Sequence, residues 1–268
     1  MHSILLPTDF SKNSQNAIDY AIYLFEREPC TFYLLHAYYL VPSETGTKFD
    51  ASIELDSMYK KLEATKSAKH TFESILVSDT ALGAIDKTIV EKDIQFVFMG
   101  TTGFSDVQDV FMGSVTTSVL KNINSSTIIA VPGEYDYDIP DDILFANDYK
   151  HTFKPAELSP IIKIASLWGS IINIVYVNSK KELENVQQSN KELLDLHLKN
   201  TKHRYIKVKK KSSVTATLKD LEKRYKNIGM VVFLKTEHSF FKKLINEPII
   251  RNMTFKTEVP IMIMPVLK

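Results

Sequence analysis

The chain has 268 residues, of which 44% are apolar and 24% charged, and this composition is typical of globular proteins with room for two domains. No stretch approaches the roughly 20 apolar residues of a membrane helix, and the N-terminus lacks the pattern of a signal peptide, so a cytoplasmic location is expected. The single cysteine, Cys30, excludes an internal disulfide and provides no metal-ligand spacing.

Charge is unevenly divided between the two halves of the sequence. Residues 1–133 carry 10 Lys and Arg against 16 Asp and Glu, whereas residues 134–268 carry 23 against 16. This difference indicates two domains with different partners, or two domains that attract each other. The sequence favours neither interpretation.

Short apolar runs alternate with helical patterns along the first half. The expected strands are Ile4–Pro7, Thr31–His36, Phe72–Val77, Gln95–Met99 and Thr127–Val131. Ser11 or Asn13 can cap a first helix, and further helices are expected at Leu55–Lys69, Ala84–Lys92 and Val115–Asn122. Apolar strands separated by helices predict a parallel sheet covered on both faces, with ligands beyond the carboxyl ends of the strands.

An internal repeat extends this pattern to the second half. Four segments recur in order: Ile4–Phe10 as Ile143–Tyr149, Thr31–Tyr38 as Ile172–Ser179, Ile94–Gly100 as Ile228–Leu234, and Ser126–Pro132 as Val259–Pro265. Ala17 and Ala156 keep the same offset within the helices that follow the first segment. Two copies of one fold are therefore expected, residues 1–133 and 143–268, joined by the acidic stretch Gly133–Asp142.

The loop after the fourth strand has the composition of a phosphate site. Gly100 and Gly103 are followed, after nine intervening residues, by Gly113 and Ser114 at the start of a helix. Glycines allow the backbone to approach an anion closely, and the free N–H groups at a helix start favour negative charge. No lysine accompanies the pair, so the P-loop pattern is absent. Each pair taken alone also suits a turn or a helix cap.

The combined spacing, G-x2-G-x9-G-[ST], resembles the motif with which ATP-binding members of the universal stress protein family hold phosphates. The segments PTDFS, LLHAY and IIAVP resemble that family as well. The resemblance implies two tandem Rossmann-like domains of the adenine nucleotide alpha hydrolase type, each with a five-stranded parallel sheet between helices. It also implies ATP as ligand, with ADP or AMP as alternatives, accompanied by Mg²⁺.

By the same resemblance, Asp9 contacts the nucleoside end and the backbone of Ala37 recognises adenine. The full expected site is Pro7, Thr8, Asp9, Ala37, Met99, Gly100, Gly103, Gly113, Ser114, Val115 and Thr116. Asp9 also suits an N-terminal turn or cap, and its recurrence as Asp148 favours that structural role. His36, with counterpart Tyr176, is interpreted as a packed, hydrogen-bonded core residue.

The second copy lacks the phosphate-binding glycines. Leu234 stands opposite Gly100, Glu237 opposite Gly103, and Glu247-Pro248 opposite Gly113-Ser114, while Asn147 replaces Thr8. A carboxylate at the phosphate position repels a second anion, so the second domain is expected to bind no ATP. Nothing in its sequence specifies another ligand.

The sequence leaves the partners open. The basic stretch between Lys199 and Lys211 contains one aromatic residue, Tyr205, and no nucleic-acid motif, which favours a solvated edge strand or loop. The family resemblance implies pairing through the last strands, here within one chain as a pseudo-dimer. A homodimer and an unknown protein partner are further expectations.

Three functions fit these observations. The preferred hypothesis is a stress-response module in which ATP orders the loop between Gly103 and Gly113 and changes a partner surface. A slow ATPase or nucleotidyl-transfer enzyme is disfavoured, because Asp106 and Asp109 come without a base and nucleophile pair, although Asp109 could help to hold Mg²⁺. An ATP-independent scaffold is the third hypothesis, and no catalytic residue is assigned.

Overall fold

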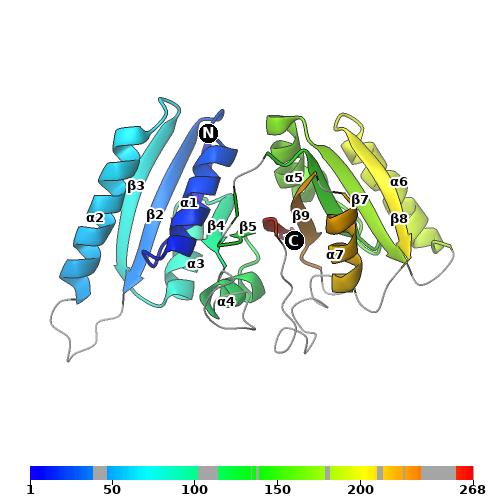
Figure 1. Ribbon diagram of the computed structural model, residues 1–268. Coiled ribbons are helices and arrows are strands. Elements are labelled where there is room, and N and C mark those ends of the chain that lie inside the picture. Colours follow the sequence, from blue (N-terminus) through cyan, green and yellow to red (C-terminus); the bar gives the residue numbers. More distant parts are fainter. Residues whose placement is uncertain are drawn as a thin grey trace. The chain divides into compact units, whose positions relative to one another are not determined.

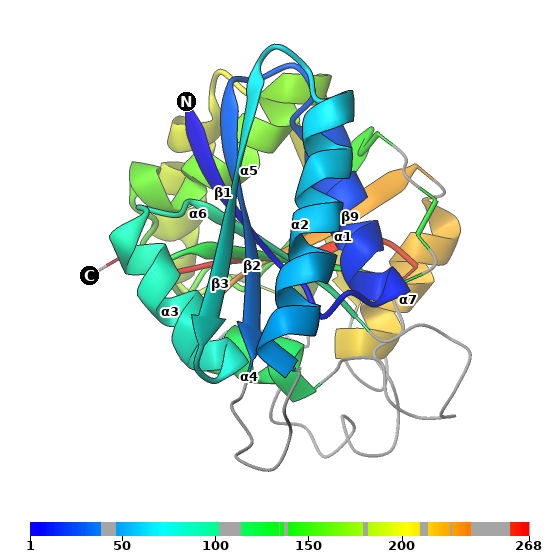
Figure 2. The same cartoon turned by 90° about the vertical axis from the view of Figure 1, so that its left-hand side faces the viewer.

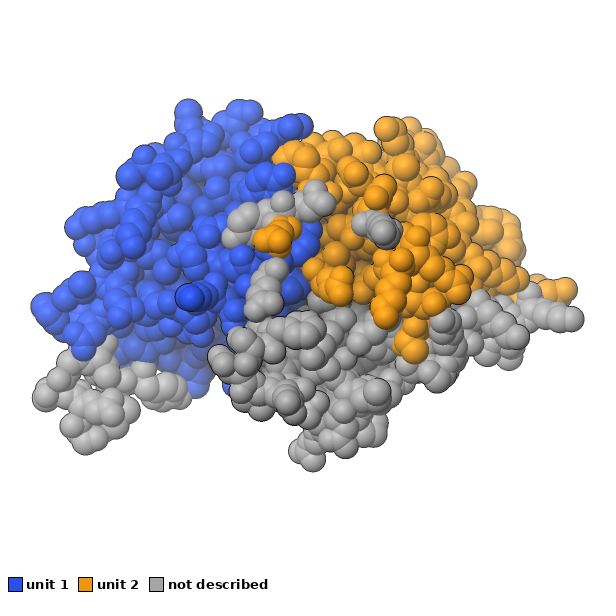
Figure 3. Space-filling model, in the orientation of Figure 1, with its two compact units in different colours: residues 1–106, 112–135 blue, residues 107–111, 136–268 orange. Residues whose placement is uncertain are grey.

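Two compact α/β units make up the chain in the computed structural model, one comprising residues 1–106 and 112–135 and the other residues 107–111 and 136–268 (Figure 3). The structure describes residues 1–38, 47–101, 114–133, 135–136, 139–178, 182–209, 214–225, 227–236 and 258–267.

The N-terminal unit alternates strands and helices (Figure 1). Its strands are β1 (His2–Pro7), β2 (Cys30–Tyr38), β3 (His70–Ser78), β4 (Phe96–Gly100) and β5 (Thr127–Val131). Its helices are α1 (Lys12–Leu24), α2 (Thr47–Thr65), α3 (Ala81–Glu91) and α4 (Ser114–Asn122). The strands are all parallel and lie in the order β3-β2-β1-β4-β5. The order reverses between β1 and β4, where ligands bind in open parallel sheets.

Helices cover both faces of this sheet. Figure 2 shows α1 and α2 on one face and α3 on the other. The strands supply fully buried side chains to both layers, such as Ile4, Leu5 and Leu6 of β1. A strand buried on both faces has no polar side to alternate with, which explains its continuous apolar sequence.

The C-terminal unit repeats this topology. Its strands are β6 (Asp142–Asn147), β7 (Ile171–Asn178), β8 (His203–Lys209), β9 (Ile228–Leu234) and β10 (Ile261–Met264). Its helices are α5 (Pro155–Trp168), α6 (Asn185–Leu198) and α7 (Val214–Arg224). The parallel strands lie in the order β10-β9-β6-β7-β8. The prediction of tandem α/β domains with five-stranded parallel sheets is confirmed, and the pairing of the two through their last strands stays a prediction.

Some local predictions needed correction. Of the two candidate caps of α1, Ser11 is the cap, since its side chain accepts a hydrogen bond from the N–H of Ser14. The second helix begins at Thr47 and ends at Thr65, instead of covering Leu55–Lys69. Ala51 is buried one turn before Leu55 and extends the apolar stripe, while the chain after Thr65 turns towards β3.

The repeat alignment of the second strands was wrong by one residue. Thr31 pairs with Ser3 of β1, and Ile171 pairs with Asp142, which stands 139 positions after Ser3. Thr31 therefore corresponds to Ile171, not to Ile172. The same register makes Tyr176 the counterpart of His36, as the sequence comparison had assigned.

Candidate functional site

A cavity of about 270 Å³ lies at the carboxyl ends of the strands in the N-terminal unit. Its lining comes from the ends of β1, β2 and β4 and from the first turns of α1, α3 and α4. Three helix starts therefore border one cavity at the place where the strand order reverses. The first N–H groups of a helix have no partner within it, so such a cavity suits a ligand with negative charge.

Nine of the eleven predicted site residues line this cavity: Pro7, Thr8, Asp9, Ala37, Met99, Gly100, Ser114, Val115 and Thr116. They come from segments up to about a hundred residues apart in the sequence, which the parallel sheet brings to one edge. Gly103 and Gly113, which complete the glycine pattern, lie outside the described residues. Their part in the site stays a prediction.

Sequence reasoning missed eight lining residues: Ser11, Asn13, Ser14, Leu35, His36, Ala81, Ile85 and Thr101. Ser11 had been identified only as a cap. Ala81 and Ile85 of α3 could have been found from the sequence. Thr80 is a typical helix cap, and it accepts a hydrogen bond from the N–H of Gly83. A helix that follows a parallel strand starts at the ligand-binding edge of the sheet.

The turn after β1 is held by short side chains. Thr8 Oγ1 accepts a hydrogen bond from the N–H of Phe10, whose φ of 62° lies in the left-handed region. The Asp9 carboxylate accepts from the N–H of Ser11 at 3.1 Å and from its hydroxyl at 2.6 Å. Partial burial acts to raise the pKa of Asp9, but hydrogen bonds from Ser11, together with smaller contributions from Ser14 and the Asp9 backbone, outweigh it and lower the pKa below its usual value. The structural role foreseen for Asp9 is present beside the cavity.

Gly100 is required by packing. A Cβ at this position would come within 2.3 Å of the backbone oxygen of Asn13 in the first turn of α1. Thr116, one of the expected site residues, donates its hydroxyl to the carbonyl of Gly100 at 3.0 Å and is buried. Ser114 and Val115 remain exposed at the start of α4, so their N–H groups and the Ser114 hydroxyl border the cavity.

Among the described residues, the equivalent place in the C-terminal unit is nearly filled. Its cavity is about 20 Å³ and is lined by Asn147, Asp148 and Leu234, the counterparts of Thr8, Asp9 and Gly100, together with His151 and Phe153. Helix α5 begins only at Pro155, so no helical turn corresponds to the first turn of α1. The segment before Pro155 instead places the buried Phe153 beside the end of β6, against the ring of Phe145.

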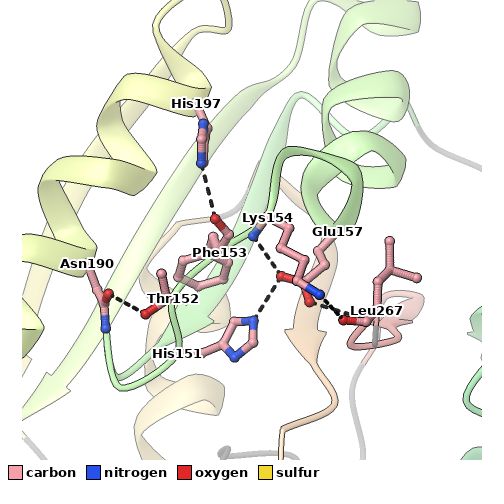
Figure 4. A network of polar contacts seen from close by, with 8 residues as sticks. All are labelled: His151, Thr152, Phe153, Lys154, Glu157, Asn190, His197 and Leu267. Carbon is pink, nitrogen blue, oxygen red and sulfur yellow. Dashed lines mark hydrogen bonds and ion pairs between the residues drawn. The ribbon is translucent and has the colours of Figure 1, made fainter.

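A network of polar contacts fixes that segment (Figure 4). The buried Glu157 carboxylate accepts from His151 Nε2 at 2.8 Å, from the N–H of Lys154 at 2.9 Å and from the N–H of Leu267 at 3.0 Å. On the other side, His197 of α6 lies 3.1 Å from the carbonyl oxygen of Phe153. The contacts with the Glu157 carboxylate and with His197 fix the segment before Pro155, which in turn holds Phe153 in the cleft.

The turn itself is the same in both units. Asn147 Oδ1 accepts from the N–H of Tyr149, and Asp148 Oδ1 accepts from the N–H of Lys150. Tyr149 has a φ of 55°, close to that of Phe10. The two units therefore share the turn that follows their first strand and differ in what lies beside it.

The basic stretch belongs largely to β8, which lies at the end of the C-terminal unit's strand order, as the edge-strand interpretation predicts. Arg204 is paired with Asp142 at 3.2 Å. Lys210 and Lys211 lie outside the described residues. Among the described residues, no helix is long and apolar enough to cross a membrane, and no group of three or more His, Cys, Asp or Glu could hold a metal ion.

Residues 1–131 match the sequence model of the universal stress protein family. No curated protein sequence matches the chain. The structure is similar to that of a universal stress protein from Archaeoglobus fulgidus DSM 4304, with a TM-score of 0.68 and 16% identity over 98% of both chains. It is also similar to a functionally unknown protein from Pseudomonas aeruginosa PAO1, with a TM-score of 0.60 and 11% identity over 99% of this chain and 92% of the other.

A third similar structure is the cytoplasmic domain of a prokaryotic cation chloride cotransporter, with a TM-score of 0.56 and 9% identity over 98% of this chain and 95% of that one. At these identities the likeness extends to the fold alone. One fold thus occurs in proteins of different names, and function has to be argued from the site.

Proposed function

Residues 1–131 belong to the universal stress protein family, and from this premise we propose that the N-terminal unit binds one adenine nucleotide in the cavity beside β1, β2 and β4. The observation that carries the proposal is the lining of this cavity. Apolar side chains of β2 and α3, such as Leu35 and Ile85, suit a base, while the exposed start of α4 offers N–H groups and a hydroxyl to phosphates.

Within this site, Ala37 would meet adenine through its backbone and Asp9 would lie near the nucleoside. Ser114 and Val115 would hold the phosphates, with the glycines at positions 103 and 113 completing the cradle. ATP is the preferred ligand, ADP and AMP are its alternatives, and Mg²⁺ would accompany the phosphates. The chain would then act as a nucleotide-dependent stress-response module without catalysis as its main role.

We further propose that the C-terminal unit binds no nucleotide in this manner. The cavity of about 20 Å³ has room for a water molecule but not for a base. Phe153 and Leu234 take up the space, and both are buried. The predicted carboxylate of Glu247 at the phosphate position lies outside the described residues and adds a second reason by charge.

An ATP-independent scaffold is the second candidate, because two observations favour it. The absence of a side chain at Gly100 is explained by the contact with Asn13, and the Asp9 carboxylate is engaged by Ser11. A protein that binds no nucleotide would therefore still need Gly100 for packing and Asp9 for the turn. A slow ATPase would need a group that activates water, and the Asp9 carboxylate in the lining is already engaged by the N–H and the hydroxyl of Ser11 in the turn.

Calorimetric titration of the nucleotide-stripped protein with Mg·ATP separates these candidates. We expect one site per chain, abolished by Gly113→Glu, which copies the carboxylate of the second domain. Glu247→Gly is the matched control and should leave the number of sites at one. Two sites in the wild type would contradict the proposal for the C-terminal unit. If the protein binds no ATP at millimolar concentration, the nucleotide proposal is wrong and the ATP-independent scaffold is the remaining candidate. Phosphate release measured in parallel tests the slow ATPase.

A further inference from the structure

Two aromatic rings pack together at the same position in both units. In the N-terminal unit, the rings of Phe10 and His36 lie 4.3 Å apart with an interplanar angle of 28°. In the C-terminal unit, Tyr149 and Tyr176 lie 5.2 Å apart at 33°. Because an aromatic pair recurs where there is almost no cavity, the pair belongs to the fold of the turn, where it packs the residue at positive φ against the end of the second strand.

The imidazole of His36 has a ring nitrogen that can accept a hydrogen bond, which the tyrosine rings of the second pair lack. His36 Nδ1 lies 2.8 Å from the carbonyl oxygen of Thr8. A carbonyl only accepts hydrogen bonds, so Nδ1 carries the proton, and in the neutral ring Nε2 is an acceptor. Nε2 forms no hydrogen bond with the described residues, and His36 lines the cavity between Leu35 and Ala37. The fold thus fixes the tautomer and leaves one acceptor available to a ligand.

We infer that His36 Nε2 accepts a hydrogen bond from the nucleoside half of the bound nucleotide and selects for that donor. This inference rests on the proposed nucleotide site. Phosphates at neutral pH have no hydrogen to donate, whereas ribose hydroxyls and the 6-amino group of adenine do. Leu35 and Ala37, which flank His36 in the sequence, and Ile85 of α3 also line the cavity, and these apolar residues suit the nucleoside. A buried acceptor left without its donor weakens binding, which is the basis of selection.

Two variants separate the two ring nitrogens. His36→Asn keeps an amide near the position of Nδ1, so it can still bond to Thr8, but it has no group at Nε2. His36→Gln places an amide near Nε2 and gives up the bond to Thr8. Titration with Mg·ATP should show affinity reduced about 3- to 10-fold in His36→Asn, the usual effect of one neutral hydrogen bond, and reduced less in His36→Gln.

Nucleotide analogues identify the donor. The wild type and His36→Asn are titrated with 2′-deoxy-ATP, 3′-deoxy-ATP and ITP, which lack the 2′-hydroxyl, the 3′-hydroxyl and the 6-amino group respectively. The analogue that lacks the donor should bind the wild type about as weakly as ATP binds His36→Asn, and should lose nothing further from that substitution. Tyr176→Asn, the equivalent change in the C-terminal unit, is the control and should leave ATP affinity unchanged.

Wild-type protein that binds ATP with the same affinity as His36→Asn would overturn the inference and leave the nucleotide site intact. An equal loss for all four ligands on the substitution would also overturn it, since no donor would then be coupled to Nε2. Wild-type protein that binds no nucleotide would overturn the proposed function and this inference together. Thermal unfolding of each variant shows whether the losses reflect binding or folding.

Discussion

The turns after β1 and β6 have equivalent hydrogen bonds, and each has a residue with left-handed backbone at the same position, Phe10 and Tyr149. Yet the cavity beside the first turn is about 270 Å³ and the cavity beside the second about 20 Å³. The difference comes from one glycine and one helical turn. Gly100 lets the first turn of α1 approach β4, whereas Leu234 occupies that place in the second unit, where α5 starts later and Phe153 fills the cleft. The comparison teaches that a repeat can keep the turn of a site while a helix that starts later and larger side chains remove the space beside it.

The largest expected effect comes from opening the filled cleft. Phe153→Ala should lower the free energy of unfolding of the C-terminal unit by about 3–5 kcal/mol, because a buried aromatic ring is replaced by a cavity. Denaturant unfolding measures this loss. Calorimetry should still give one ATP site, because Leu234 and the altered loop remain. A second site in this variant would show that Phe153 alone closes the cleft.

The reverse change adds a side chain at the open site. Gly100→Ala should lower the free energy of unfolding of the N-terminal unit by about 1–3 kcal/mol, because the new Cβ meets the backbone of Asn13 and the first turn of α1 has to move. Gly83→Ala is the matched control: its Cβ meets side-chain ends of Asp79 and Thr80 instead of backbone, and alanine favours a helix, so the loss should be smaller although the Thr80 cap has to adjust. Equal losses in the two variants would refute the packing role of Gly100.

Removing the carboxylates of Asp9 and Asp148 separates their shared role in the turn from the role in ATP binding proposed for Asp9 alone. Asp9→Ala and Asp148→Ala should each lower the free energy of unfolding by about 1 kcal/mol, since each carboxylate accepts a backbone hydrogen bond in its turn. Only Asp9→Ala should weaken ATP binding in calorimetry. If the Asp9→Ala variant binds ATP with unchanged affinity, Asp9, like Asp148, stabilises the turn and has no part in binding.

A further expected effect depends on pH and concerns Lys235, which follows β9 where Thr101 follows β4. Burial lowers the pKa of Lys235 to about 8 from the usual 10.5. Between these values the unfolded chain holds a proton that the folded chain has released, so stability should rise with pH from 8 to 10. Unfolding measured across this range should show a shallower rise in Lys235→Met. The exposed Lys150→Met serves as control, and an identical slope in both variants would contradict the assignment.

Much of the fold was determined locally. Continuous apolar runs such as Ile4–Pro7 and Gln95–Met99 predicted strands, because a strand buried on both faces has no polar side. The order of these runs, their recurrence after residue 142 and the spacing of glycines after β4 gave the topology and nine residues of the cavity lining. Pro155 was an unused signal for the late start of α5, since the residue before a proline avoids helical backbone.

Tertiary structure decided what the motif residues do. The contact of Gly100 with Asn13, the bond from Thr116 to Gly100 and the filling of the second cleft by Phe153 each join residues from separate elements. A sequence motif reports which residue types occur at a spacing, and glycine suits a phosphate and a close backbone approach equally well. The choice between these roles depends on which atoms occupy the neighbouring space, and only long-range packing of the chain fixes that.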